Sequence, residues 1–397
     1  MAKEVSSILR KSDSRGENVS FVELLFDLIY VFAVTQLSHY LIDKLSFVTL
    51  LEQFLLLCAV WMAWQHTVWV TNWFDPDSPP IRTLLFILML LGMFMAAAIP
   101  DAFQYRSHTF AFSYVAIQLG RSVYMNIVLR RYKLLSSYYI RISVWAFVMS
   151  ALWIAGSFMG GYLRLAFWGA AVLIDLLSPM SNFGVPVFRG SLSWKNWPVH
   201  GHYLSDRSRL FMIIAFGETI LMTGVTLSAI PDWNYLQVTA AVISFVTSIA
   251  MWWIYFEVCS GTECKIRTTN SRYLGLKYHW LHLMLIGAVI ICAVGDELAV
   301  GEVSTVPRDG TGLLYIFGMI AYLAGNMIYK RIIYRTVKVS YIIGMVIFLL
   351  IAPLTFVLPM LSLSGLSCIV LLSVIIMDVM IESRLKRKVP LADNTAS

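Results

Sequence analysis

The chain has few charged residues and lacks several catalytic signatures. Only 13% of its 397 residues are charged, whereas soluble proteins carry roughly 25%. The first twenty residues are polar and contain no signal-peptide apolar core, so we expect the first spanning helix to direct membrane insertion. No phosphate-binding loop, GxSxG elbow or HExxH motif is present. An ATP-driven pump is excluded as well, because the loops are too short to hold a nucleotide-binding domain.

Cysteine is also scarce and is not arranged for metal binding. The five cysteines show no CxxC spacing, and Cys259 and Cys264 have no histidine nearby. The sequence therefore predicts no zinc site, no disulfide framework and no cofactor.

Apolar residues dominate instead, at 59% of the chain. They form twelve stretches of the length that spans a bilayer, about 20 residues each. We therefore predict an all-α polytopic membrane protein with about twelve transmembrane helices. The stretches are 21–42, 48–73, 81–100, 108–130, 139–158, 162–180, 206–228, 235–257, 273–297, 312–330, 340–359 and 363–382.

The basic residues predict how these helices are oriented. If successive loops lie on alternate sides, 25 of the 30 Lys and Arg fall on the side of the N-terminus. Only Lys44, Arg106, Arg164 and Arg308 fall on the other side, and Arg121 lies within a helix. By the positive-inside rule, both termini are cytoplasmic. The net charge of +7 thus reflects topology, and we expect the lipid bilayer, not a nucleic acid, as partner.

The sequence matches itself at an offset of 195 residues. "LMLLGMFMAAAIPDAF" (88–103) aligns with "LMLIGAVIICAVGDEL" (283–298), and Glu23 aligns with Glu218. Two six-helix repeats of the same orientation are therefore expected, over 21–180 and 206–382. A cytoplasmic N-terminal segment (1–20), a cytoplasmic linker (181–205) and a cytoplasmic tail (383–397) complete the predicted organisation.

Two motifs point to a known family. "ELLFDL" (23–28) and "GETIL" (217–221) resemble the first-helix and seventh-helix signatures of the bacterial low-temperature-requirement A (LtrA) family. The family pattern has a histidine and an acidic–arginine pair before the seventh helix. Here the pair is Asp206–Arg207, and Tyr203 stands at the histidine position, beside His202. The resemblance implies a multi-pass protein of the bacterial inner membrane linked to growth in the cold.

Two glutamates are candidates for an ion or substrate pathway. Ser20 and Glu23 match a capping box, so Glu23 has a structural explanation at the interface. Glu218 is expected near the middle of the seventh helix, if that helix begins near Asp206. An acid at that depth costs roughly 2.5–3.5 kcal/mol unless it is paired or neutralised, which favours a pathway or proton-binding role. Gly217 beside it allows close helix approach or a local break.

Asp27 and Arg121 are predicted to form an ion pair. The repeat aligns Asp27 with Met222 at the offset of 195. Further along, where "GRSVYMNIVLRRYK" (120–133) matches "GNMIYKRIIYRTVK" (325–338) at an offset of 205, it aligns Arg121 with Asn326. One half therefore has both charges and the other half has neither. A lone membrane arginine is costly, whereas a paired one is tolerated. The pair would tie the first helix to the fourth, and a conformational switch is the alternative.

Other polar and aromatic residues have a structural reading and a functional alternative. His279 and His282 lie three residues apart and share a helix face. For these two and His66, hydrogen bonding between helices is favoured over a proton relay. Asp101 and Asp296 are expected at outer helix ends, with an ion vestibule as the alternative. The tryptophans of 61–75 and 251–256 are read as interfacial belts and core packing, with stacking on a ring-bearing ligand as the alternative.

Together these features favour a secondary transporter or channel over an enzyme. It would move a small solute or cation, with proton linkage through the buried carboxylates, along Glu218, Glu23, Asp27, Arg121, His282 and His279. One alternative is a lipid-modifying enzyme with a cleft near His200, His202 and Asp206. Another is a membrane sensor or assembly factor in cold adaptation. The sequence allows a homo-oligomer.

Overall fold

The computed structural model describes residues 8–10, 19–42, 46–181, 183–185, 200–257, 272–307, 310–334 and 336–388. Most of the predicted N-terminal segment and of the linker 181–205 therefore lies outside the described residues. So do Cys259, Cys264, Lys44, Arg308 and the end of the predicted tail. The other three cysteines are buried and free.

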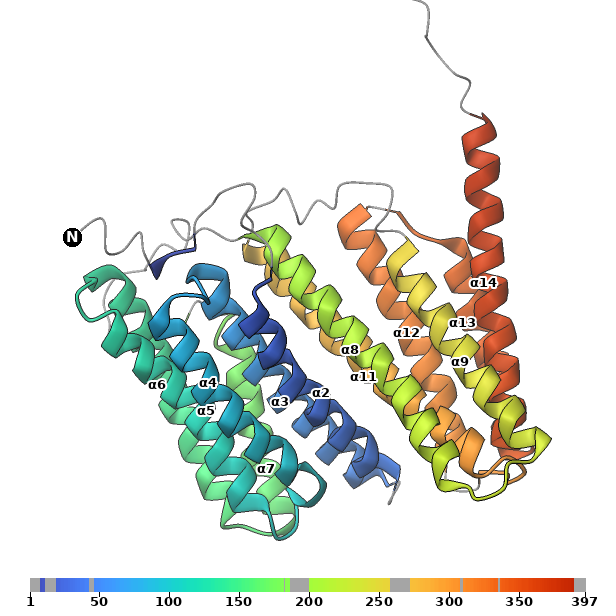
Figure 1. Cartoon of the computed structure of the whole chain (residues 1–397), viewed down its shortest axis with the longest axis horizontal. Helices are drawn as coiled ribbons and strands as arrows, with labels where there is room; N and C mark the ends of the chain where they lie inside the picture. The colour runs from blue at the N-terminus through green and yellow to red at the C-terminus, as the bar shows by residue number, and fades with distance from the viewer. Residues whose placement is uncertain are drawn as a thin grey trace, which may run out of the picture. The chain divides into compact units, whose positions relative to one another are not determined.

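The all-helical prediction is confirmed: the described residues form twelve α-helices and two short 3₁₀ segments (Figure 1). Only an isolated bridge between Leu9 and Phe74 has β-type pairing there. The elements are α2 (Phe21–Ile42), α3 (Phe47–Trp73), α4 (Pro79–Ala98), η1 (Ile99–Asp101), α5 (Ser107–Val128), α6 (Lys133–Ser157), α7 (Gly161–Leu177), α8 (Gly201–Ala229), α9 (Tyr235–Phe256), α11 (Arg272–Gly301), α12 (Thr311–Tyr334), α13 (Val339–Ile351), η4 (Ala352–Phe356) and α14 (Met360–Lys388).

Ten of these helices, with α13 counted together with η4, are long and apolar enough to cross a membrane. The two that fall short are α5, which carries polar residues such as Gln118 and Arg121, and α7, which has 17 residues. Large apolar side chains such as Leu350 and Ile369 are exposed on the helices, as expected where lipid replaces water. The chain is a multi-pass membrane protein.

Local sequence explains several helix ends. Ser46 caps α3 by accepting from the Thr49 amide at 3.1 Å, and Asn234 forms a capping box with Gln237 at the start of α9. The expected helix over 340–359 is interrupted: α13 ends at Ile351 and continues as η4. Pro353 lies in η4 and lacks the N–H that a continuing α-helix needs.

The chain divides into two compact units. The first comprises Met1–Phe211 with Ile266–His279, and the second comprises Met212–Lys265 with Trp280–Ser397. In the first unit, α2 packs on α3 and α4, while α4, α5, α6 and α7 pack in sequence and α7 returns to α3 (Figure 1). In the second unit, α9 packs on α14, and α12, α13 and α14 pack together.

Candidate functional site

The segment before α2 places the positive charge of Arg10 at the C-terminal end of α3. Ile8–Arg10 runs antiparallel to the end of this helix: the Asp75 amide donates to Ile8 O at 2.8 Å, and the Arg10 amide donates to Trp73 O at 3.1 Å. Arg10 Nε also donates to Thr71 O at 2.9 Å. These backbone bonds hold the Arg10 guanidinium 3.3 Å from Glu23.

Glu23 lies in the first unit and combines a capping role with an ion pair. The predicted capping box is confirmed, because Glu23 Oε2 accepts from the Ser20 amide at 2.8 Å and Ser20 Oγ accepts from the Glu23 amide at 3.4 Å. Tyr203 donates its hydroxyl to Glu23 and lies 2.6 Å from Thr71 Oγ1. The Arg10 guanidinium stacks over the Tyr203 ring at 4.0 Å. Glu23 is fully buried, and these contacts satisfy it.

Asp27 pairs with Arg207, so the predicted Asp27–Arg121 ion pair is wrong. Arg207 Nη2 donates to Asp27 Oδ1 at 2.6 Å, and Trp64 Nε1 donates to the same oxygen at 2.8 Å. The sequence reading placed Arg207 at the boundary of a cytoplasmic loop. However, α8 begins at Gly201, and Arg207 is buried within it.

We call Arg10, Glu23, Asp27 and Arg207 the acid–arginine cluster. It contains two carboxylates and two guanidinium groups, and Arg207 also lies 3.9 Å from Glu23. Because the charges balance and are hydrogen-bonded, the cluster can be tolerated at depth. It ties α2 to α8 and to the segment preceding α2. Arg10, Tyr203 and Trp64 were not predicted as partners from the sequence. The Asp206–Arg207 pair in the family pattern was the one signal for Arg207.

Arg121 binds neutral acceptors. Its guanidinium donates to Thr67 Oγ1 at 3.2 Å, to Ala63 O at 3.4 Å and to Gln118 Oε1. Gln118 Oε1 also lies 3.2 Å from His66 Nδ1, and Gln118 Nε2 donates to Asp175 at 2.9 Å. Arg121 forms no ion pair within the described part of the chain. This buried guanidinium has hydrogen bonds but no carboxylate in direct contact.

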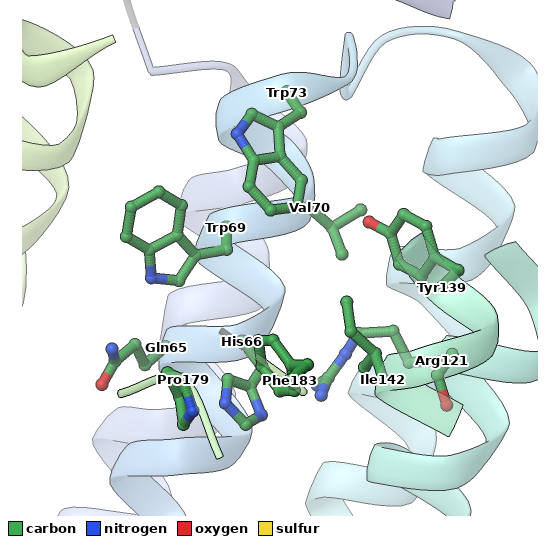
Figure 2. Close-up of a pocket in the computed structure, with 11 residues that line it drawn as sticks. Gln65, His66, Trp69, Val70, Trp73, Arg121, Tyr139, Ile142, Pro179 and Phe183 are labelled. Carbon is green, nitrogen blue, oxygen red and sulfur yellow. The ribbon is translucent and has the colours of Figure 1, made fainter. Parts of the chain in front are cut away.

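A cavity of about 60 Å³ lies beside Arg121 and His66 in the first unit. Figure 2 shows the Arg121 side chain reaching toward His66, with the indole rings of Trp69 and Trp73 nearby. The Tyr139 hydroxyl is buried and has no hydrogen-bond partner among the described residues. The lining residues are Gln65, His66, Trp69, Val70, Trp73, Arg121, Ser122, Tyr139, Ile142, Pro179 and Phe183. This Arg121 cavity combines a positive charge with aromatic walls.

Glu218 lies in the second unit, buried within α8. Its neighbour Thr219 lies 2.6 Å from Ser248 of α9, hydroxyl to hydroxyl. At Gly217, α8 continues without a break, and a Cβ built there would meet no atom of another described element within 4 Å. The glycine therefore does not serve close helix approach.

The histidines make separate contacts. His282 Nε2 lies 2.7 Å from the Tyr255 hydroxyl in the second unit, whereas His279 packs edge-on against Trp61 in the first. Across the described ranges, no group of three His, Cys, Asp or Glu residues could hold a metal ion. At the start of α8, His202 Nδ1 lies 2.9 Å from Asp206 Oδ2 and both are partly exposed, while the His200 amide donates to Asn72 at 3.2 Å.

Asp296 is not at a helix end, contrary to expectation. α11 continues to Gly301, and Asp296 is fully buried in the second unit. Tyr315 of α12 donates its hydroxyl to Asp296 Oδ1 at 3.1 Å. Asp101, by contrast, closes η1, is partly exposed and lies 3.4 Å from Arg106.

Comparisons with known proteins give the chain a family. Residues 18–376 match the model of the bacterial low temperature requirement A protein (LtrA). The chain is also 34% identical over 352 residues to RA0937, named an uncharacterized protein, of Rhizobium meliloti (strain 1021); the match covers 87% of this chain and 85% of that protein. No solved structure matches the chain. Since the family match spans nearly all the helices described above, the chain belongs to the bacterial low temperature requirement A family.

Proposed function

We propose that this protein is a secondary transporter of the bacterial inner membrane for a small anionic solute with an apolar or ring-bearing body. The Arg121 cavity carries the proposal. Its guanidinium donates only to neutral acceptors, and the nearby Asp175 is linked to it through Gln118. An anionic group of the solute would therefore give Arg121 a direct counter-charge. Trp69 and Trp73 would stack against the solute body.

The unpartnered Tyr139 hydroxyl supports the same assignment. A buried hydroxyl without a partner costs free energy unless a ligand or water completes it. A cavity of about 60 Å³ has room for several waters, so a small solute can exchange with them.

Glu218 is assigned the coupling proton, because a buried carboxylate in a spanning helix marks a proton or ion pathway by default. Glu23 and Asp27, which are paired with arginines within the acid–arginine cluster, would hold α2 and α8 in place beside the route. His279 and His282, which contact aromatic side chains, would serve the packing of α11.

The test is uptake of radiolabelled benzenesulfonate into proteoliposomes, since its permanent charge prevents leak as a neutral acid. The wild-type protein should take up benzenesulfonate, and Arg121→Gln should reduce uptake at least tenfold. Arg82→Gln is the matched control, because Arg82 forms an exposed pair with Asp77 and should leave uptake unchanged. Equal uptake by wild type and Arg121→Gln would refute the role of the cavity.

The role of Glu218 needs a second measurement. In Glu218→Gln, accumulation driven by a pH gradient should be lost, while exchange of internal for external solute should persist, because exchange needs no net proton movement. Glu302→Gln is the control, since Glu302 is exposed. If Glu218→Gln still accumulates solute against a gradient, Glu218 does not carry the coupling proton.

A further inference from the structure

A seam of small hydroxyl residues surrounds Asp296 in the second unit. α9 and α14 lie side by side (Figure 1) and contribute two pairs, Ser244 with Thr247 and Ser364 with Ser367. The two members of each pair are three residues apart, so they lie on the same face of their helix. All four side chains are at least 99% buried. The seam therefore lines the contact between the two helices.

The hydroxyls of this seam do not make the hydrogen bonds that serine and threonine usually make within a helix. Buried Ser and Thr in membrane helices commonly donate to a backbone carbonyl one turn earlier, as Ser248 does to Ser244 O at 3.0 Å. The Oγ atoms of Ser244, Ser364 and Ser367, and Thr247 Oγ1, have no hydrogen-bond partner among the described residues. Four such buried oxygens in one seam point to a bound water or ion that satisfies them.

Asp296 directs a carboxylate at this seam. Ser244 and Ser364 face it closely enough to interact with it, yet neither reaches hydrogen-bond geometry, and Asp296 Oδ2 has no partner. The titratable groups near it, Tyr315, Cys292 and Cys368, are neutral side chains. No basic residue of the described ranges pairs with Asp296, so its charge is uncompensated.

Gly295 allows Tyr315 to lie close to Asp296. A Cβ at this position would lie 2.0 Å from the Tyr315 ring, so only glycine lets α12 approach α11 this closely. The approach brings the Tyr315 hydroxyl to Asp296. Hydroxyl oxygens from α9, α12 and α14 thus lie around the Asp296 carboxylate of α11.

We propose that Asp296, Ser244, Ser364 and Tyr315 bind a dehydrated monovalent cation, with Na⁺ preferred over K⁺. Hard oxygen donors suit alkali and alkaline-earth cations. One carboxylate with neutral hydroxyls carries a single negative charge, so a monovalent ion leaves the buried site neutral, whereas a divalent ion would leave a costly excess charge. The close packing at Gly295 favours the smaller ion.

The experiment measures ²²Na⁺ binding to the purified full-length protein in detergent, together with the thermal midpoint in NaCl, KCl and N-methylglucamine chloride at equal ionic strength. The wild type should bind one Na⁺ per chain and show a Na⁺-specific rise in midpoint. Asp296→Asn should lose binding. Ser364→Ala should weaken it roughly tenfold, the effect of one contact to a charged group.

Asp101→Asn is the matched control, because Asp101 is the residue that the predicted repeat aligns with Asp296 and it already pairs with Arg106. It should bind Na⁺ like the wild type. If Asp296→Asn does not fold, Ser364→Ala and Tyr315→Phe decide the question. The proposal fails if the wild type binds no Na⁺, if these variants bind it unchanged, or if only pH alters the midpoint, which would assign a proton to Asp296.

This test is independent of transport. Sodium binding without benzenesulfonate uptake would keep the cation site and reject the proposed function. Benzenesulfonate uptake without sodium binding would keep the proposed function and reject the cation site.

Discussion

The two units of this protein bury carboxylates in different ways. In the first unit, Glu23 and Asp27 contact Arg10 and Arg207. Trp64 donates to Asp27 Oδ1, while Asp27 Oδ2 has no hydrogen-bond partner among the described residues. In the second unit, Asp296 meets only neutral side chains, and one of its oxygens has no partner in the described residues. A balanced ionic cluster holds helices together, whereas an uncompensated carboxylate needs a proton or a cation. The difference separates a structural role from a binding role.

Removing Arg207 should have the largest effect. Arg207→Met leaves Asp27 buried without its counter-charge and should destabilise the protein by about 3–5 kcal/mol. The double variant Asp27→Asn/Arg207→Met should recover part of this loss, because the stranded charge is gone. Thermal unfolding in detergent measures both. A double variant as unstable as the single one would contradict the pairing, and Arg82→Gln, in an exposed pair, should cost less than about 1 kcal/mol.

Removing the indole donor to Asp27 should have a smaller effect. Trp64→Phe keeps an aromatic ring beside Phe211 but loses a hydrogen bond to a charged group, worth about 1.5–3 kcal/mol. Trp153→Phe is the control, since Trp153 is equally buried but its Nε1 has no partner among the described residues. Both unfolding midpoints are measured in one detergent. Equal losses would mean that the hydrogen bond contributes nothing.

Asp296→Asn should act in the opposite direction to Asp27→Asn. In sodium-free buffer it replaces an uncompensated carboxylate with a neutral amide and should raise stability by up to about 3 kcal/mol. Asp27→Asn, by contrast, strands Arg207 and should lower stability. The comparison uses unfolding midpoints in N-methylglucamine chloride. A loss of stability in both variants would place Asp296 with the structural carboxylates.

The smallest effect is expected at Tyr139. Its hydroxyl has no partner among the described residues but borders a cavity with room for water, so Tyr139→Phe should change stability by less than about 0.5 kcal/mol. If a solute completes that hydroxyl, the variant should nonetheless weaken benzenesulfonate binding severalfold, measured as the ligand-dependent shift in midpoint. Unchanged binding would remove Tyr139 from the solute site.

Local rules predicted much of the fold. A low charge content and twelve apolar stretches predicted twelve helices, because each such stretch satisfies its own backbone only as a helix in lipid. The Ser20–Glu23 capping box was also predictable, since both partners lie within one turn. The two same-orientation repeats and the cytoplasmic termini stay predictions.

The sequence alone did not predict which buried side chains of different helices contact each other. The predicted repeat suggested that Asp27 pairs with Arg121, because one half has both charges and the other has neither. However, α8 begins early enough to bury Arg207 against α2. Likewise, Asp296 was expected at a helix end until α11 continued past it to Gly301.

Hydropathy and capping are properties of neighbouring residues, so the sequence by itself determined the helices and the membrane class. Which buried charges meet depends on helix length and packing between distant segments. Only the tertiary structure could therefore decide that Asp27 is paired, that Arg121 borders a cavity and that Asp296 faces hydroxyls without a basic partner among the described residues.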